Sequence, residues 1–152
     1  MQRKSKVYLD NSVISAAFDK RNPERKKTTE EFFAVAERFE IFVSETTMDE
    51  IGMAQNKNLR DKMKGLVLNY HVLKMDDSVR CLATKYVENG AIPPSNYNDA
   101  LHLAFAVRNE VDYLLSWNFQ HIVRMKTKNI VNAVNTLEGL NQIIILTPGE
   151  LV

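Results

Sequence analysis

Short apolar runs alternate with helical patterns along the whole chain, and this alternation constrains the fold more than any other feature. Five runs are expected to be strands, over residues 6–10, 40–44, 71–74, 113–116 and 142–147. The segments between them predict helices over 28–39, 45–54, 59–69, 76–89, 98–109 and 129–140. Strands separated by helices indicate an α/β fold, with a parallel sheet covered on both faces.

The length and composition narrow the class of protein. A chain of 152 residues fits one domain, over residues 1–152. No apolar run reaches the ~18 residues of a membrane span, and the apolar stretch before Asp10 is too short for a secretory signal. The single cysteine, Cys81, excludes an intrachain disulfide and a thiolate metal site. We expect Cys81 to face the core, and we expect a reducing, cytoplasmic location.

Three acidic residues stand where apolar elements start or stop. Asp10 ends the first run, Glu50 follows the second, and Asp99 opens the helix that leads to the fourth. Right-handed crossovers bring the carboxyl ends of parallel strands to one edge, where ligands bind. Carboxylates gathered there repel each other unless a cation intervenes, and hard divalent cations prefer oxygen ligands. The pattern predicts a metal-dependent phosphoryl-transfer site.

Each of these residues also has a structural alternative. Asp10 could cap the helix that follows it, and Glu50 fits a capping box that begins at Thr47. Asp99 lies in the first turn of a helix that is apolar nearly all round, so its charge needs compensation. His102 shares a face with Asp99 and is expected to be a core or supporting residue. The other two histidines, His71 and His121, are expected to be structural.

Four segments together resemble the PIN-domain family, and in particular VapC-like toxins. They are Val7-Tyr8-Leu9-Asp10-Asn11-Ser12-Val13-Ile14, Asn98-Asp99-Ala100-Leu101-His102-Leu103-Ala104, Tyr113-Leu114-Leu115-Ser116-Trp117-Asn118-Phe119 and Ile144-Ile145-Leu146-Thr147-Pro148-Gly149-Glu150-Leu151. They follow the family's order and span essentially the whole chain. The resemblance implies a three-layer α/β/α sandwich with a parallel five-stranded sheet. It also implies a Mg²⁺- or Mn²⁺-dependent ribonuclease, commonly the homodimeric toxin of a toxin–antitoxin pair.

The resemblance assigns roles to individual positions. Asp10, Glu50 and Asp99 match the family's first three acidic positions and would bind the metal. The fourth acidic position falls on Asn118, which offers an oxygen but no negative charge, so one tightly held metal ion is expected. Ser12 and Ser116 would orient ligands or water.

The residues and the resemblance together predict an endoribonuclease that uses Asp10, Glu50, Asp99 and Asn118. The resemblance also implies an antitoxin protein as a partner. Basic segments at 20–27 and 57–64 are candidates for holding the RNA backbone. Trp117 could stack on a base or pack in the protein. One alternative is an inactive PIN-like module that binds RNA or a protein. Another is a phosphohydrolase with Asp10 as a covalent nucleophile, although Ser12 stands where that mechanism wants a second aspartate.

Overall fold

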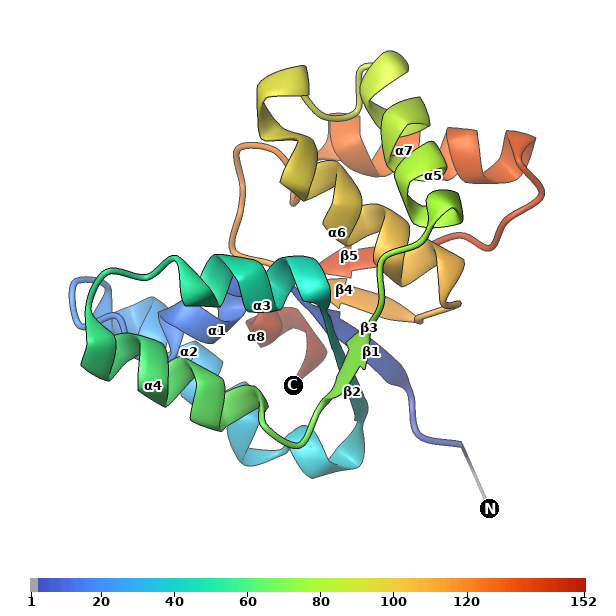
Figure 1. Ribbon diagram of the computed structural model, residues 1–152. Helices are drawn as coiled ribbons and strands as arrows, with labels where there is room; N and C mark the ends of the chain where they lie inside the picture. The colour runs from blue at the N-terminus through green and yellow to red at the C-terminus, as the bar shows by residue number, and fades with distance from the viewer. Residues whose placement is uncertain (1–2) are drawn as a thin grey trace.

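A five-stranded parallel sheet forms the centre of the protein (Figure 1), which a computed structural model describes over residues 3–152. The strands are β1 (Lys6–Leu9), β2 (Glu40–Ser44), β3 (His71–Leu73), β4 (Tyr113–Leu115) and β5 (Ile144–Leu146). Their order across the sheet is β3-β2-β1-β4-β5, and each neighbouring pair is parallel. The predicted α/β fold with five parallel strands is therefore confirmed.

Helices cover both faces of this sheet and make three layers. The helices are α1 (Asn11–Ala16), α2 (Pro23–Ala34), α3 (Glu45–Gly52), α4 (Lys57–Val67), α5 (Asp77–Glu88), α6 (Tyr97–Arg108), α7 (Met125–Leu137) and α8 (Pro148–Leu151), with short 3-10 turns η1 (Ala36–Arg38) and η2 (Pro94–Asn96). In Figure 1, α5, α6 and α7 lie on one side of the sheet, whereas α1 to α4 and α8 lie on the other.

The alternation of side chains along each strand creates two separate cores. Successive strand residues point to opposite faces, so one strand supplies both layers. Residues Tyr8, Phe42, Leu114 and Ile145 pack with α5, α6 and α7. Residues Val7, Leu9, Ile41, Val43 and Leu115 pack with α1, α2 and their neighbours.

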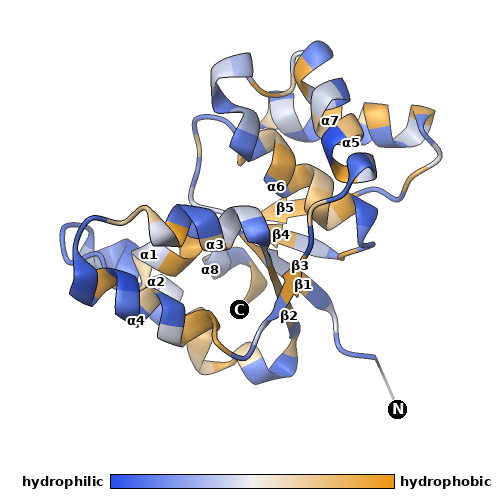
Figure 2. Ribbon diagram, in the orientation of Figure 1, coloured by the Kyte–Doolittle hydropathy of each residue, from blue (hydrophilic) through white to orange (hydrophobic). Residues whose placement is uncertain are grey.

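Helix α6 is buried along most of its length. All residues from Ala100 to Val107 are buried, as expected for a helix that is apolar nearly all round. Figure 2 shows the contrast between the hydrophobic α6 and the largely hydrophilic α4. A helix enclosed in this way cannot slide or roll freely, so the residues in its first turn, including Asp99, have fixed positions.

Two helices begin at least four residues earlier than the sequence predicts. Helix α2 begins at Pro23 rather than residue 28, because the Asn22 side chain caps it and Pro23 suits the first helical position. Helix α7 begins at Met125 rather than residue 129. The residue before it, Arg124, makes no side-chain capping hydrogen bond, so the sequence carries no capping signal for this start. The last predicted turn of α2 is a separate 3-10 turn, η1.

Of three further local predictions around α5, two are confirmed and one is wrong. Asp76 caps α5 by accepting a hydrogen bond from the backbone N–H of Val79, as expected. Gly90 has a φ of 82° and follows the end of α5, which is the usual place for a left-handed residue. The prediction that Cys81 faces the core is wrong, because Cys81 is exposed on α5.

The strand order creates a switch point beside β1. The chain runs from β1 outward to β2 and β3, then returns to place β4 on the other side of β1. Crossovers that leave in opposite directions open a crevice at the carboxyl ends of the two central strands, which is where α/β proteins bind ligands.

At the opposite edge, Asp112 ties the start of β1 to β4. Its carboxylate accepts hydrogen bonds from the backbone N–H of Lys6 at 2.8 Å and from both terminal nitrogens of Arg3 at 3.1 and 3.2 Å. Burial raises the pKa of Asp112, but the contacts with Arg3 and Lys6 outweigh it, so the pKa lies below its usual value.

We predict that Asp112→Asn lowers the free energy of unfolding by about 1 kcal/mol at pH 7. A lowered folded-state pKa stabilises the protein above the unfolded-state pKa of about 3.9, and this contribution is lost as the pH falls through the folded-state value. Urea unfolding at neutral and acidic pH measures the difference. Asp77→Asn, which removes a fully exposed carboxylate that pairs with Arg80, is the control and should change little. A deficit that is equally large at about pH 3 would contradict the assignment.

Candidate functional site

The three predicted acidic residues and Asn118 line one pocket at the carboxyl edge of the sheet. The pocket has a volume of about 310 Å³. Its lining consists of Asp10, Asn11, Ser12, Ser15, Glu50, Asp99, His102 and Asn118. The structure therefore brings together residues that are up to 108 positions apart (118 − 10). They come from the end of β1, from α1, α3 and α6, and from the loop after β4.

Asp10 both caps α1 and lines the pocket, so the capping role does not remove its carboxylate from the site. It is buried, with 3% of its surface exposed. Its Oδ1 accepts hydrogen bonds from Ser12 Oγ at 2.5 Å and from the N–H of Val13 at 3.3 Å, and its Oδ2 accepts from Ser116 Oγ at 2.5 Å. Burial raises the pKa of Asp10 above its usual value, although nearby His102 and the two serine hydroxyls oppose the shift.

Asp99 is held by groups from the loop after β4. Its Oδ2 accepts a hydrogen bond from Asn118 Nδ2 at 3.1 Å and lies 3.2 Å from His121 Nδ1. Burial raises the pKa of Asp99, and the charges of His102 and His121 partly offset this effect. His121, which was expected to be structural, thus contacts a carboxylate that lines the pocket.

Glu50 is oriented by a buried chain of polar groups. Its Oε1 accepts a hydrogen bond from His102 Nε2 at 2.5 Å, and His102 Nδ1 is 2.6 Å from the hydroxyl of Tyr8. That hydroxyl is in turn 2.7 Å from Ser44 Oγ. Burial lowers the pKa of His102, but the hydrogen bond and charge of Glu50, with the charges of Asp10 and Asp99, raise it overall.

The capping box that competes for Glu50 forms elsewhere. Ser44 caps α3, and the residue that completes the box is Thr47, whose hydroxyl accepts from the N–H of Ser44. The Glu50 side chain is therefore free to contact His102. The sequence predicted a capping box from Thr47 to Glu50. The observed box runs from Ser44 to Thr47, about one helical turn earlier.

Asn118 organises the loop that closes the pocket. Its Oδ1 accepts a hydrogen bond from the N–H of His121 at 2.9 Å, its Nδ2 donates to Asp99, and its own N–H donates to Ser116 Oγ at 2.9 Å. Sequence reasoning missed His121, because nothing in the sequence signals that a turn at Asn118 returns this ring to Asp99. The only sequence signal for this contact is the turn-forming residue Asn118, three positions before His121.

Comparisons with known proteins rest on structure alone. No family model matches the sequence, and no curated protein matches it either. Among solved structures, VapC20 from Mycobacterium tuberculosis, a toxin that cleaves the sarcin–ricin loop, matches with a TM-score of 0.59 and 9% identity, over 90% of this chain and 98% of that one. VapBC2 from Rickettsia felis, bound to a DNA fragment from its promoter, matches with a TM-score of 0.55 and 12% identity, over 92% and 96%.

The chain has the PIN-like fold of VapC toxins. This likeness covers about nine tenths of the chain. Across residues 3–152, no helix is both long enough and apolar enough to cross a membrane.

The donor set fits a hard divalent cation, although its side chains are engaged with one another. Asn11, which lines the same pocket, has a buried Oδ1 without a hydrogen-bond donor in the described part of the chain. Carboxylate and amide oxygens are the donor types that a hard divalent cation prefers. As arranged over residues 3–152, no three His, Cys, Asp or Glu side chains form a group that could hold a metal ion. Instead, the carboxylate oxygens accept hydrogen bonds from hydroxyl, amide and imidazole groups.

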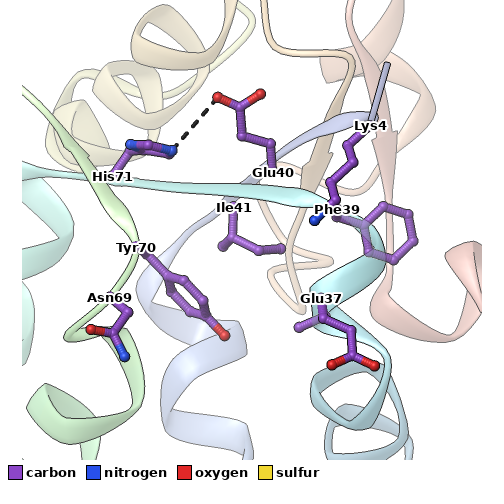
Figure 3. Close-up of a pocket in the computed structure, with 9 residues that line it drawn as sticks. Lys4, Glu37, Phe39, Glu40, Ile41, Asn69, Tyr70 and His71 are labelled. Carbon is purple, nitrogen blue, oxygen red and sulfur yellow. Dashed lines mark ion pairs between the residues drawn. The ribbon is translucent and has the colours of Figure 1, made fainter. Parts of the chain in front are cut away.

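A larger pocket lies at the opposite edge of the sheet (Figure 3). Its volume is about 600 Å³, and its lining includes Lys4, the start of β2 and the start of β3. Its only ion pair in the described residues joins His71 to Glu40 at 3.6 Å, and both side chains are well exposed. Because it contains no cluster of carboxylates and lies away from the strands' carboxyl ends, we assign the chemistry to the smaller pocket.

We predict that Tyr8→Phe destabilises the protein by about 1–3 kcal/mol, because it leaves buried partners of the hydroxyl unsatisfied without changing the packing of the ring. Chemical denaturation measures the loss. Tyr70→Phe is the matched control, because the Tyr70 hydroxyl makes no hydrogen bond within residues 3–152. Equal effects of the two substitutions would show that the buried polar chain does not contribute to stability.

Proposed function

We propose that this protein is a Mg²⁺- or Mn²⁺-dependent endoribonuclease that cleaves RNA phosphodiester bonds in the cytoplasm. The observation that carries the proposal is the convergence of Asp10, Glu50 and Asp99 on one pocket at the carboxyl edge of the sheet. The likeness in fold to a toxin that cleaves the sarcin–ricin loop supports RNA as the substrate.

In this proposal Asp10, Glu50 and Asp99 hold the metal ion, once the hydrogen bonds that now occupy their oxygens rearrange. The ion would supply Lewis-acid stabilisation of the phosphate and a lowered pKa for the attacking water. Ser12 and Ser116 hold the two oxygens of Asp10 in place.

The supporting residues orient the carboxylates rather than attack the substrate. His102 fixes the direction of Glu50, and Tyr8 fixes the ring of His102. Asn118 and His121 do the same for Asp99. A hydrogen-bonded second layer of this kind is typical of metal sites and tunes how strongly the ligands bind.

The double variant Asp10→Asn, Asp99→Asn should lower the rate of single-stranded RNA hydrolysis by roughly 10³-fold or more, because two charged ligands are lost. Asparagine remains a good helix cap at position 10, so the fold should survive. The assay compares initial rates with Mg²⁺, with Mn²⁺ and with a chelator. Asp61→Asn with Asp77→Asn removes two exposed carboxylates and should leave the rate unchanged. Hydrolysis that persists in the Asp10→Asn, Asp99→Asn variant would contradict the proposal.

A second candidate function is an inactive PIN-like module that binds RNA or a protein partner. Asn118 favours it, because an amide that donates to Asp99 stands where a fourth carboxylate would strengthen metal binding. No divalent ion binding at millimolar concentration would favour this alternative.

The variant Asn118→Asp tests the role of that missing charge. Without metal, the substitution places a second carboxylate next to Asp99, and the repulsion between the two should lower the melting temperature. With Mn²⁺ the added charge should tighten binding about tenfold and raise the melting temperature by about 2–4 °C more than in the parent. Thermal unfolding with Mn²⁺ or chelator measures both effects. Asn141→Asp, an exposed substitution beside the opposite edge of the sheet, is the control. Identical Mn²⁺ responses in both variants would exclude metal binding beside residue 118.

We extend the proposal to the toxin of a type II toxin–antitoxin pair, which would act as a homodimer and be blocked by an antitoxin protein. The support is the likeness to a chain of the VapBC2 assembly. A small neighbouring gene for a DNA-binding protein, and co-purification of its product with this chain, would support the pairing.

A further inference from the structure

A second pocket lies beside the carboxylate pocket, on the other side of the loop after β4. Its volume is about 330 Å³. Its lining consists of Asn22, Glu24, Arg25, Thr28, Trp117 and Phe119. The loop residues alternate between the two pockets, because Trp117 and Phe119 line this one whereas Asn118 lines the other. A ligand bound here would therefore lie next to the proposed reaction site.

Trp117 forms a fixed wall of this pocket. Its Nε1 donates a hydrogen bond to Thr29 Oγ1 at 2.9 Å, and the buried Thr29 hydroxyl donates to the carbonyl of Arg25 at 2.7 Å. Its backbone N–H donates to Ser12 Oγ at 2.8 Å. These contacts join the loop to α2 and to the carboxylate pocket, so the indole is held in place before any ligand arrives.

Arg25 lies over the two aromatic rings with its hydrogen-bond donors unused. Its guanidinium carbon is 5.0 Å from the centre of the Trp117 ring and 5.7 Å from that of Phe119. Within residues 3–152 the guanidinium makes no hydrogen bond or ion pair with protein, and Glu24 does not pair with it. Six other arginines donate to protein oxygens, whereas the exposed Arg38 shares the lack of a protein partner within residues 3–152. The six are Arg3, Arg21, Arg60, Arg80, Arg108 and Arg124.

Phe119 presents an aromatic surface to solvent beside this guanidinium. Phe119 is 51% exposed, so its ring is accessible to a ligand. Its ring centre lies 6.2 Å from that of Trp117, at a tilted angle. The pocket therefore offers an unpaired planar cation and an accessible aromatic ring, which are the two groups that recognise an unstacked nucleotide.

We propose that this pocket binds one nucleotide of single-stranded RNA adjacent to the phosphate that is cleaved. Arg25 binds the nucleotide's phosphate through its free N–H donors, and Phe119 stacks on the base. The inference rests on the proposed function for its link to cleavage, but the binding itself can be measured separately. Duplex RNA cannot occupy the pocket, because its bases are already stacked and paired.

Trp117 provides a direct reporter, because it is the only tryptophan in the chain. We expect a single-stranded RNA of about ten nucleotides to change its fluorescence, and duplex RNA of the same length to have little effect. The titration uses the full-length Asp10→Asn, Asp99→Asn protein with chelator, so that binding is read without cleavage. Phe119→Leu should weaken binding about tenfold.

Arg25→Gln should also weaken binding about tenfold and reduce the slope of log Kd against log salt by about 0.7, the value for one phosphate contact on a single strand. The matched control is Arg38→Gln, which removes an exposed arginine that precedes β2 at the opposite edge of the sheet. Binding by the control should equal that of the parent.

The outcomes separate this inference from the proposed activity. RNA cleavage by the parent protein, combined with equal RNA binding by Arg25→Gln and Arg38→Gln, overturns the nucleotide pocket and leaves the nuclease standing. The pocket is also overturned if duplex and single-stranded RNA change Trp117 fluorescence equally. Arg25-dependent quenching without cleavage supports the pocket and counts against the nuclease.

Discussion

The burial of the Asp10 carboxylate is the constraint on which the rest of the site depends. A carboxylate removed from water must be compensated by hydrogen bonds or by positive charge. Here Ser12 comes from the helix that Asp10 begins and Ser116 comes from the adjacent central strand's end, so one side chain joins β1, α1 and β4. The same hydrogen bonds place the acid at the edge where the two halves of the sheet diverge.

Around this acid, two independent polar networks hold the remaining carboxylates. Glu50 is oriented from within the core, through His102 and Tyr8, whereas Asp99 is oriented from the loop after β4. Each network contains a histidine, His102 or His121, together with neutral hydroxyl or amide groups. Burial raises the pKa values of Asp10 and Asp99, and the charge of His102 partly opposes both shifts.

The architecture was predictable because short apolar runs alternate along the chain with segments of helical periodicity. The runs identified the five strands, and the all-apolar segment after Asp99 identified the buried helix. Helix starts were harder, since α7 begins without a side-chain cap. Polar contacts were least accessible to sequence reasoning. The link between His102 and Glu50 spans 52 positions and that between His121 and Asp99 spans 22, and neither spacing carries a local signal.

The loop after β4 serves two pockets through alternate residues. Asn118 contacts an acidic side chain on one side, while the aromatic residues that flank it pack with α2 on the other. Inserting or deleting one residue between Ser116 and Phe119 would exchange the side chains that face the two pockets. An aromatic ring would then enter the acidic pocket, and the Asn118 amide would leave it. We expect proteins that share this arrangement to differ in side chains across this segment while keeping its length.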